Sequence, residues 1–195
     1  MIASNNKVEK ASGKRRTPRL NKAEWLSRSM RLLEKRGPAA IKLDSLTRHL
    51  GVTTGSFYWH FKSHTRFLDE LTDMYIQEFT YAVSDHLATL DLPPRDLMAE
   101  AMRQIITKGL GGMDVHFRSL AITYPRLRRK IRAMDEHRTS VITEMFKGMG
   151  YKGEELRMRA HAFVVLHSME SAVNTGLSNR DRIDLLDERM RLLAD

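Results

Sequence analysis

The longest regular feature of the sequence is an amphipathic stretch that begins at Ser63 or Thr65 and ends near Leu90. Its apolar side chains recur every three or four residues, which is typical of one face of an α-helix. They are Phe67, Leu68, Leu71, Met74, Tyr75, Phe79, Ala82, Val83 and Leu87. No segment shows sustained period-two alternation with β-branched residues, the pattern of a half-buried strand. We therefore expect an all-α fold, in which this helix is too long to serve only one small domain.

Two shorter helices are expected before this stretch. Asn21 and Glu24 have the spacing of a capping box, so a first helix should begin there and end at Gly37. A second helix should span residues 43–50, because three leucines at helical spacing lie on one face of it. Gly51 follows, and a residue without a Cβ can turn the chain sharply.

A third helix should start after Thr53, whose hydroxyl can accept from a backbone N–H of the first turn. Phe57 and Phe61 are four residues apart and should share its buried face. Two short helices joined by a glycine turn form the helix-turn-helix pattern. We expect this motif between Leu43 and His60, with its second helix able to enter the major groove of DNA.

The residue types from 51 to 62 suit that groove. Small residues at the helix start let the backbone approach the bases, and the hydroxyls of Thr and Ser can bond base edges. Tyr, His and Lys side chains can reach flanking phosphates. Tyr58 and Trp59 could instead be packing residues, because aromatic side chains near a helix end are often half buried.

Positive charge is concentrated in the first third of the chain. Residues 1–62 hold 14 Lys and Arg against 4 Asp and Glu, a net charge of +10, whereas the other 133 residues hold 19 bases and 20 acids. This distribution is expected if the first third binds a polyanion. Residues 1–20 should form a flexible basic arm, which either is a solvated tail or follows the DNA backbone into the minor groove.

The segment resembles the DNA-binding domain of the TetR family of bacterial regulators. The resemblance rests on Gly51-Val-Thr53, on Tyr58-x-His60-Phe-Lys62 and on the long helix that follows at once. It covers about residues 21–70, and the rest of the chain resembles the family only in its helical layout. The resemblance implies a three-helix domain over 21–64 and a larger helical domain over 65–195 that dimerises and usually binds a small molecule.

The resemblance also implies roles for individual residues. Thr54, Ser56, Tyr58 and Trp59 would face bases or sugars, with Gly55 allowing close approach, while Thr53, His60 and Lys62 would hold phosphates. The chain departs from the family pattern at Lys42, Thr47 and His64. Lys42 replaces the usual Thr or Ser cap of the second helix and could reach a phosphate instead.

Further helices should follow the long one. We expect one from Asp96, as N-cap, to Lys108, a flexible loop at Gly109–Gly112, and a short helix that starts at Asp114. Later helices should span 126–149, about 154–175 and about 180–193. In the last of these, Ile183, Leu186, Met190 and Leu193 form a narrow apolar seam that needs a partner.

The seam predicts a dimer interface built from the last two helices of each subunit. The predicted interface residues are Leu156, Phe163, Val173, Ile183, Leu186 and Met190. The alternative is that the seam packs inside its own subunit. A two-fold dimer would suit DNA binding, because two recognition helices would meet half-sites about one helical turn apart.

A ligand pocket is expected between the long helix and the last helices. The chain has 12 methionines, whose flexible thioethers suit an adaptable apolar cavity, although such residues more often form ordinary core. The candidate lining residues are Tyr75, Phe79, Met102, Met113, Phe117, Tyr124, His137 and Phe163.

Several other classes of protein are excluded or disfavoured. The chain has no cysteine, and it carries no histidine metal motif, phosphate loop, dinucleotide fingerprint or nucleophile elbow. No apolar run approaches the ~20 residues of a membrane span. We expect a cytoplasmic, dimeric, sequence-specific DNA-binding regulator without cofactor or metal, namely a repressor that a small molecule releases from a palindromic operator. The alternatives are a ligand-independent regulator or an activator of the same fold, and, less favoured, an enzyme.

Overall fold

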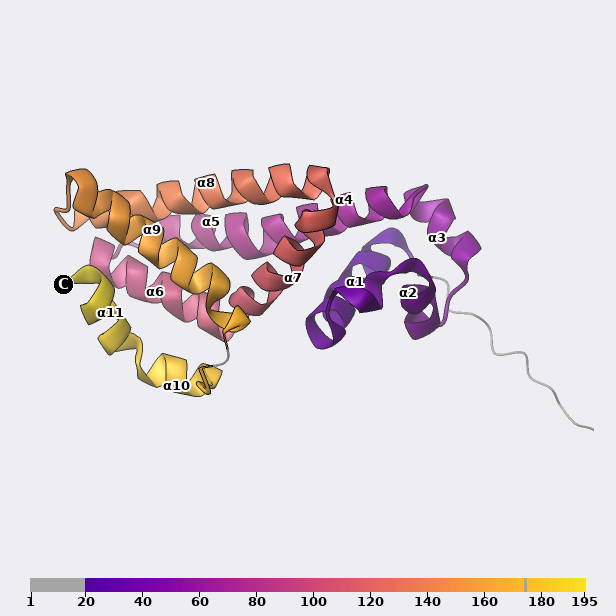
Figure 1. Cartoon of the computed structure of the whole chain (residues 1–195). Coiled ribbons are helices and arrows are strands. Elements are labelled where there is room, and N and C mark those ends of the chain that lie inside the picture. Colours follow the sequence, from indigo (N-terminus) through magenta and orange to yellow (C-terminus); the bar gives the residue numbers. More distant parts are fainter. Residues whose placement is uncertain (1–19, 174) are drawn as a thin grey trace, which may run out of the picture.

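The computed structural model describes residues 20–173 and 175–195, and all regular structure in these residues is helical (Figure 1). The all-α prediction is therefore confirmed. The elements are α1 (Lys22–Arg36), η1 (Pro38–Ile41), α2 (Leu43–Leu50), α3 (Thr54–Phe61), α4 (His64–Ile76), η2 (Gln77–Tyr81), α5 (Ala82–Ala88), α6 (Pro94–Thr107), α7 (Leu110–Thr123), α8 (Pro125–Gly148), α9 (Gly153–Met169), η3 (Glu170–Ala172), α10 (Asn179–Asp184) and α11 (Leu186–Ala194).

Helices α1 to α3 gather at one end of the molecule (Figure 1). The predicted capping box opens α1: Asn21 Oδ1 accepts from the backbone N–H of Glu24 at 2.9 Å, and Glu24 Oε2 accepts from the N–H of Asn21 at 2.8 Å. Trp25 is fully buried in the middle of the three helices. Residues 1–19 of the predicted arm lie outside the described residues, and Leu20, its predicted end, is buried.

One helical rod connects this end to the rest of the molecule. It begins with α4, passes through a π-helical turn, η2, and continues as α5 (Figure 1). The predicted long helix is thus confirmed, with an interruption that its apolar spacing did not indicate. The apolar side chains of α4 join those of α1 to α3 and of α7 and α8 in one core cluster, whereas those of α5 join a second cluster with α6, α8, α9 and α11.

Ion pairs fasten the start of α8 to α4. Arg126 Nη1 lies 3.3 Å from Asp69 Oδ2, and Lys130 Nζ lies 2.6 Å from Asp73 Oδ1. These partly exposed pairs each contribute only ~0–1 kcal/mol. Their main effect is to align two helices that lie side by side in Figure 1.

Glycines 109–112 do not form the predicted flexible loop. Gly109 turns the chain with φ 63°, and the other two glycines, Gly111 and Gly112, lie inside α7. The reason is close packing: a Cβ on Gly111 would lie 3.0 Å from both the carbonyl oxygen of His167 and Ser171 Oγ. A glycine here lets α7 approach α9, and Asp114, which was predicted to start a helix, is buried in its middle.

Two further helix boundaries differ from the prediction. Helix α6 starts at Pro94, because Pro fits the first turn of a helix, and Asp96 lies within that turn rather than at the cap. Helix α9 ends at Met169, not near residue 175, and the final segment contains two short helices, α10 and α11.

Candidate DNA interface and ligand cavity

The helix-turn-helix is built as its residue types predict. Gly51 takes a left-handed conformation with φ 66° and ends α2. Thr53 Oγ1 accepts from the backbone N–H of Ser56 at 3.2 Å and caps α3. Phe57 and Phe61 are fully buried, with ring centroids 5.6 and 6.0 Å from that of Trp25 in edge-on contacts. These contacts fix which face of α3 points outward.

The outward face carries most of the predicted base-contacting residues. Tyr58 is 48% exposed and Trp59 is 71% exposed. Thr53, Thr54 and Gly55 are exposed at the start of the helix, and Ser56 is half buried. The packing alternative for the two aromatic side chains therefore does not describe them, since α3 presents both to solvent.

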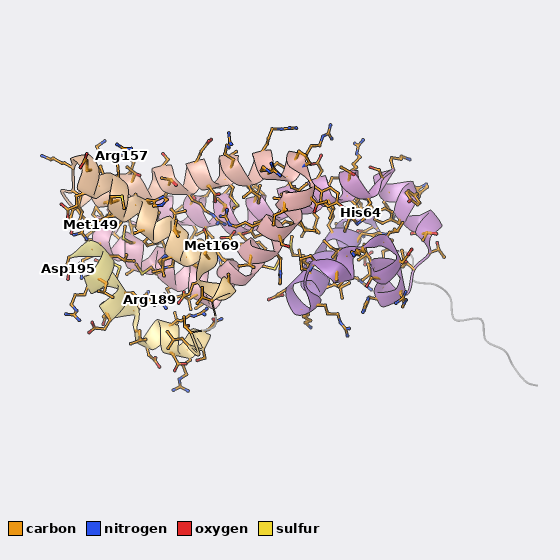
Figure 2. The ribbon with its side chains drawn as sticks, in the orientation of Figure 1. His64, Met149, Arg157, Met169, Arg189 and Asp195 are labelled. Atoms are coloured by element: carbon orange, nitrogen blue, oxygen red, sulfur yellow. The ribbon has the colours of Figure 1, made fainter. Side chains whose placement is uncertain are left out.

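His60 is less available for a phosphate than predicted. It is half buried, and its Nε2 lies 2.9 Å from the carbonyl oxygen of Leu20, to which it must donate because a carbonyl oxygen only accepts. His64 makes the same kind of bond, from Nε2 to the carbonyl oxygen of Ile41 at 2.9 Å, at the junction of the N-terminal helices with α4 (Figure 2). Both histidines hold the small domain together, a role that the sequence did not indicate.

Exposed lysine and arginine side chains of the helix-turn-helix region lack a carboxylate partner in the described part of the chain. Lys42, Arg48 and Lys62 are exposed, and none of them forms an ion pair with a carboxylate of the described residues. Lys42 stands at the N-cap of α2 without a side-chain cap bond, as its departure from the family pattern suggests. Lys62 has φ 63°, a conformation that is uncommon outside glycine and often occurs at functional sites.

Comparison with known proteins agrees with this geometry. Residues 26–71 match the family described as "Bacterial regulatory proteins, tetR family". These residues therefore form a TetR-type DNA-binding domain. Most of the chain resembles several solved structures in fold, three of which are described below. No curated relative matches its sequence.

The first of these structures is a transcriptional regulator from Rhodococcus, 14% identical, with a TM-score of 0.71 over 89% of this chain and 96% of the other. FadR from Bacillus subtilis with stearoyl-CoA is 14% identical, with a TM-score of 0.67 over 88% and 96%. AibR with isovaleryl coenzyme A and operator DNA is 15% identical, with a TM-score of 0.66 over 87% and 95%. At these identities the likeness is one of fold.

The larger helical part of the chain contains a cavity of about 70 Å³ between η2, α5, α6, α7, α8 and α9. Phe79 and Phe163 line it, as predicted. The other six predicted residues do not. Tyr75, Met102, Met113 and Phe117 are buried in the core, and Tyr124 is half buried at the α7–α8 turn. His137 is half buried and forms a hydrogen bond of 3.0 Å with Oγ of Ser84, which does line the cavity. The four core side chains fill space between helices and do not border this cavity.

A buried polar cluster that the sequence did not reveal lies at one side of the cavity. Tyr75 Oη donates to Asp114 Oδ1, and Arg138 Nη1 donates to Asp114 Oδ2 at 2.6 Å. Arg138 Nε also donates to Thr80 Oγ1 at 3.0 Å, inside the π-helical turn. Burial, together with the charge of Asp114, raises the pKa of Tyr75 well above its usual range. The cluster joins α4, η2, α7 and α8.

His167 of α9 lines the same cavity and is 5% exposed. Burial is the largest cause that lowers its pKa from 6.5 to about 4, with a smaller contribution from Arg189, while Glu170 and the bond to Phe163 act in the opposite direction. The imidazole is therefore neutral near pH 7.

We expect the free energy of unfolding to fall between pH 6.5 and 5 because of His167. The unfolded chain binds a proton on this residue near pH 6.5, whereas the folded chain does so only near pH 4, so acid favours unfolding. Urea unfolding should show a fall over this range that is about 2 kcal/mol smaller in His167→Leu than in the parent chain. His161→Leu, at an exposed site of the same helix, is the control. Equal falls in the parent and His167→Leu would refute the assignment.

The predicted dimer seam lies largely inside the subunit. Phe163, Leu186 and Met190 are 2%, 5% and 3% exposed in the second core cluster, and Leu156 and Ile183 are half buried against it. Helix α11 packs on α6 and α9 of its own chain, so the within-subunit alternative describes these residues. Of the predicted set, Val173 is exposed, at 62%.

A different apolar surface is exposed in this part of the chain. It consists of Met158, Val165, Leu166, Met169 and Val173 on and after α9, and of Leu177, Leu185 and Leu192 in the final segment. We call it the C-terminal apolar surface; Figure 2 labels Met169 within it. Residues 158, 165 and 169 recur at helical spacing, so they share one face of α9.

Among the described residues, no group of three or more potential metal-ligating side chains comes together, and no helix has both the length and the apolar character to cross a bilayer.

Proposed function

We propose that this TetR-family regulator is a homodimeric repressor that binds a palindromic operator through α3 and leaves it when a small molecule occupies the cavity. The observation that supports DNA binding is the outward face of α3, where Tyr58 and Trp59 are exposed. Lysine and arginine side chains without a carboxylate partner among the described residues are exposed in the same helix-turn-helix region. Thr53, Lys42 and Lys62 flank this face and suit phosphate contacts. This arrangement supports DNA recognition rather than catalysis.

The chemistry of α3 limits how it would read bases. Residues 54–61 contain no Arg, Lys, Asn, Gln, Asp or Glu, the side chains that read guanine, adenine or cytosine edges directly. Hydroxyls of Thr54 and Ser56 can bond base edges, and the rings of Tyr58 and Trp59 offer apolar contact to thymine methyl groups. We expect thymine at the positions beneath α3.

Selection of bound sites from random duplex DNA tests the proposed DNA binding. A palindromic consensus with half-sites about one helical turn apart is the expected result, because two recognition helices on a two-fold axis have that separation. The absence of any consensus would overturn sequence-specific binding. Reporter transcription from the selected site, with and without the protein, separates a repressor from an activator.

The C-terminal apolar surface supports the homodimer. Exposed large apolar side chains that share a helix face are typical of a protein interface, and here they lie at the opposite end of the chain from α3. An isologous pairing of this surface would leave both copies of α3 free.

Val165→Glu and Met169→Glu are expected to convert the dimer to a monomer, because each places a carboxylate in an apolar interface. Light scattering after gel filtration measures the mass, and operator affinity should fall in parallel. Ile122→Glu is the matched control, since Ile122 is a 74% exposed apolar residue on α7. A parent chain that is already monomeric, or variants that stay dimeric, would contradict this interface.

The rod of α4, η2 and α5 supports coupling between ligand and DNA. Its first part packs in the core of the small domain, and Phe79 and Thr80 of η2 line the cavity. A ligand that moves η2 would tilt α4 and change the separation of the two α3 helices. FadR and AibR, both bound to an acyl-CoA in the structures above, support a small-molecule effector in this fold. A bound ligand that leaves operator affinity unchanged would favour the ligand-independent alternative.

A further inference from the structure

The cavity between η2, α5, α6, α7, α8 and α9 has a mainly apolar lining. Phenyl, leucyl, isoleucyl and valyl side chains supply most of it, among them Phe79, Leu87 and Phe163. At about 70 Å³ it is roughly half the size of a ~150 Å³ core cavity that binds benzene. Without rearrangement of its lining, the cavity therefore has room only for a small molecule.

The charged groups of the lining neutralise one another. Asp114 and Arg138 are the only Asp, Glu, Lys or Arg residues among the described lining residues, and they form an ion pair with a 2.6 Å contact. Arg138 also donates to Thr80 Oγ1, and Asp114 accepts from Tyr75. An anionic ligand would meet a guanidinium that is already paired and a carboxylate of like charge, so it would gain little and lose its hydration.

His167 is the one lining residue with a buried polar atom that lacks a partner. Its Nδ1 lies 2.8 Å from the carbonyl oxygen of Phe163, which only accepts, so Nδ1 carries the hydrogen. The imidazole is neutral near pH 7, so Nε2 holds a lone pair. This Nε2 is buried and has no hydrogen-bond partner in the described part of the chain. An unsatisfied buried acceptor is costly, which favours a molecule that donates to it.

We infer that the cavity selects an uncharged, mainly apolar ligand with a hydroxyl or N–H group, and that this group donates its hydrogen bond to Nε2 of His167. An alcohol is the simplest member of this class. The inference rests on the proposed function for the effect of the ligand on DNA, but binding itself is independent of DNA.

Three probes of similar size test this class in the unmodified chain. They are 1-butanol, its isomer methyl propyl ether, which has no donor, and butanoate, which is charged. NMR titration of the ¹⁵N-labelled protein measures each affinity, and the ¹⁵N resonance of His167 Nε2 reports the new hydrogen bond. We expect 1-butanol to shift this resonance and to bind about five- to tenfold more tightly than the ether, the effect of about one hydrogen bond, with butanoate weaker still.

His167→Leu should bind 1-butanol and the ether equally, because the acceptor is gone while the apolar volume remains. His161→Leu, at the exposed position of α9, should keep the preference of the parent chain. Because the comparison among the three probes uses the parent chain, it stands even where His167→Leu fails to fold. Equal affinities for the three probes, no binding of any of them, or tight 1-butanol binding without a shift at Nε2 would overturn the inference.

Operator binding in the presence of 1-butanol separates this inference from the proposed function. If the alcohol binds at His167 and the DNA affinity does not change, the ligand class holds and the release mechanism is wrong. If DNA release occurs with butanoate but not with 1-butanol, the release mechanism holds and the ligand class is wrong.

Discussion

Replacing Trp59 with alanine should weaken operator binding by about 2 kcal/mol, or roughly 30-fold, and leave the fold intact. The side chain is 71% exposed, and its closest ring contact is the edge of His60, with centroids 4.5 Å apart. Little packing would therefore be lost in the free protein. In the complex, the indole would bury a large apolar area against the groove, and the variant would lose that burial.

Fluorescence anisotropy with a labelled operator measures the affinity, and thermal unfolding measures the fold. Tyr58→Ala should weaken specific binding in the same assay, and Trp59→Phe should keep part of the affinity. Ile122→Ala is the matched control, because Ile122 is as exposed as Trp59 but lies on α7. Unchanged affinity of Trp59→Ala, at unchanged stability, would exclude Trp59 from the interface.

Asp114→Asn should lower the free energy of unfolding by about 3–5 kcal/mol, the effect of removing one partner from a buried ion pair. The side chain of Asp114 is 3% exposed and that of Arg138 is 17% exposed, so the variant leaves a guanidinium with little access to water. Burial acts to lower the pKa of Arg138, but the charge of Asp114 outweighs it and holds that pKa above its usual value. Without that carboxylate, the buried positive charge has no compensation.

Urea unfolding measures the loss, and Asp135→Asn is its control. Asp135 receives two bonds from Arg118, at 2.6 and 2.8 Å, but both side chains are partly exposed, so its loss should be only about 1 kcal/mol. The double variant Asp114→Leu, Arg138→Met should recover most of the stability, because apolar replacement of both partners is often neutral. Equal losses in Asp114→Asn and Asp135→Asn would contradict the role assigned to the buried cluster.

Local chemistry was sufficient to predict the helix-turn-helix. Asn21, Gly51 and Thr53 act on their own neighbours, through a capping box, a left-handed turn and a side-chain cap, so their types reveal where helices start and end. The buried face of α3 also follows from the spacing of Phe57 and Phe61. The candidate DNA-binding face is the opposite, exposed face of α3.

The structure of the larger helical part depends on tertiary contacts, which the spacing of apolar residues in the sequence does not reveal. Three glycines among residues 109–112 predicted a loop. Gly111 is helical instead, and a glycine stands there because α9 comes too close to leave room for a Cβ. The apolar seam of α11 was equally compatible with a second subunit and with its own core, and it packs in its own core. Only Phe79 and Phe163 of the cavity lining were predicted, because apolar residues that fill space and those that border a cavity have the same sequence pattern.

The π-helical turn sets a rotational offset between the two ends of the rod. An α-helix advances about 100° per residue, and a π-turn accommodates about one extra residue, so the faces on either side of η2 are turned relative to a continuous α-helix. This offset lets α4 face the first core cluster and α5 the second, with Phe79 in contact with both. The length of η2, counted in single residues, therefore determines the angle at which the DNA-binding helices are carried relative to the cavity.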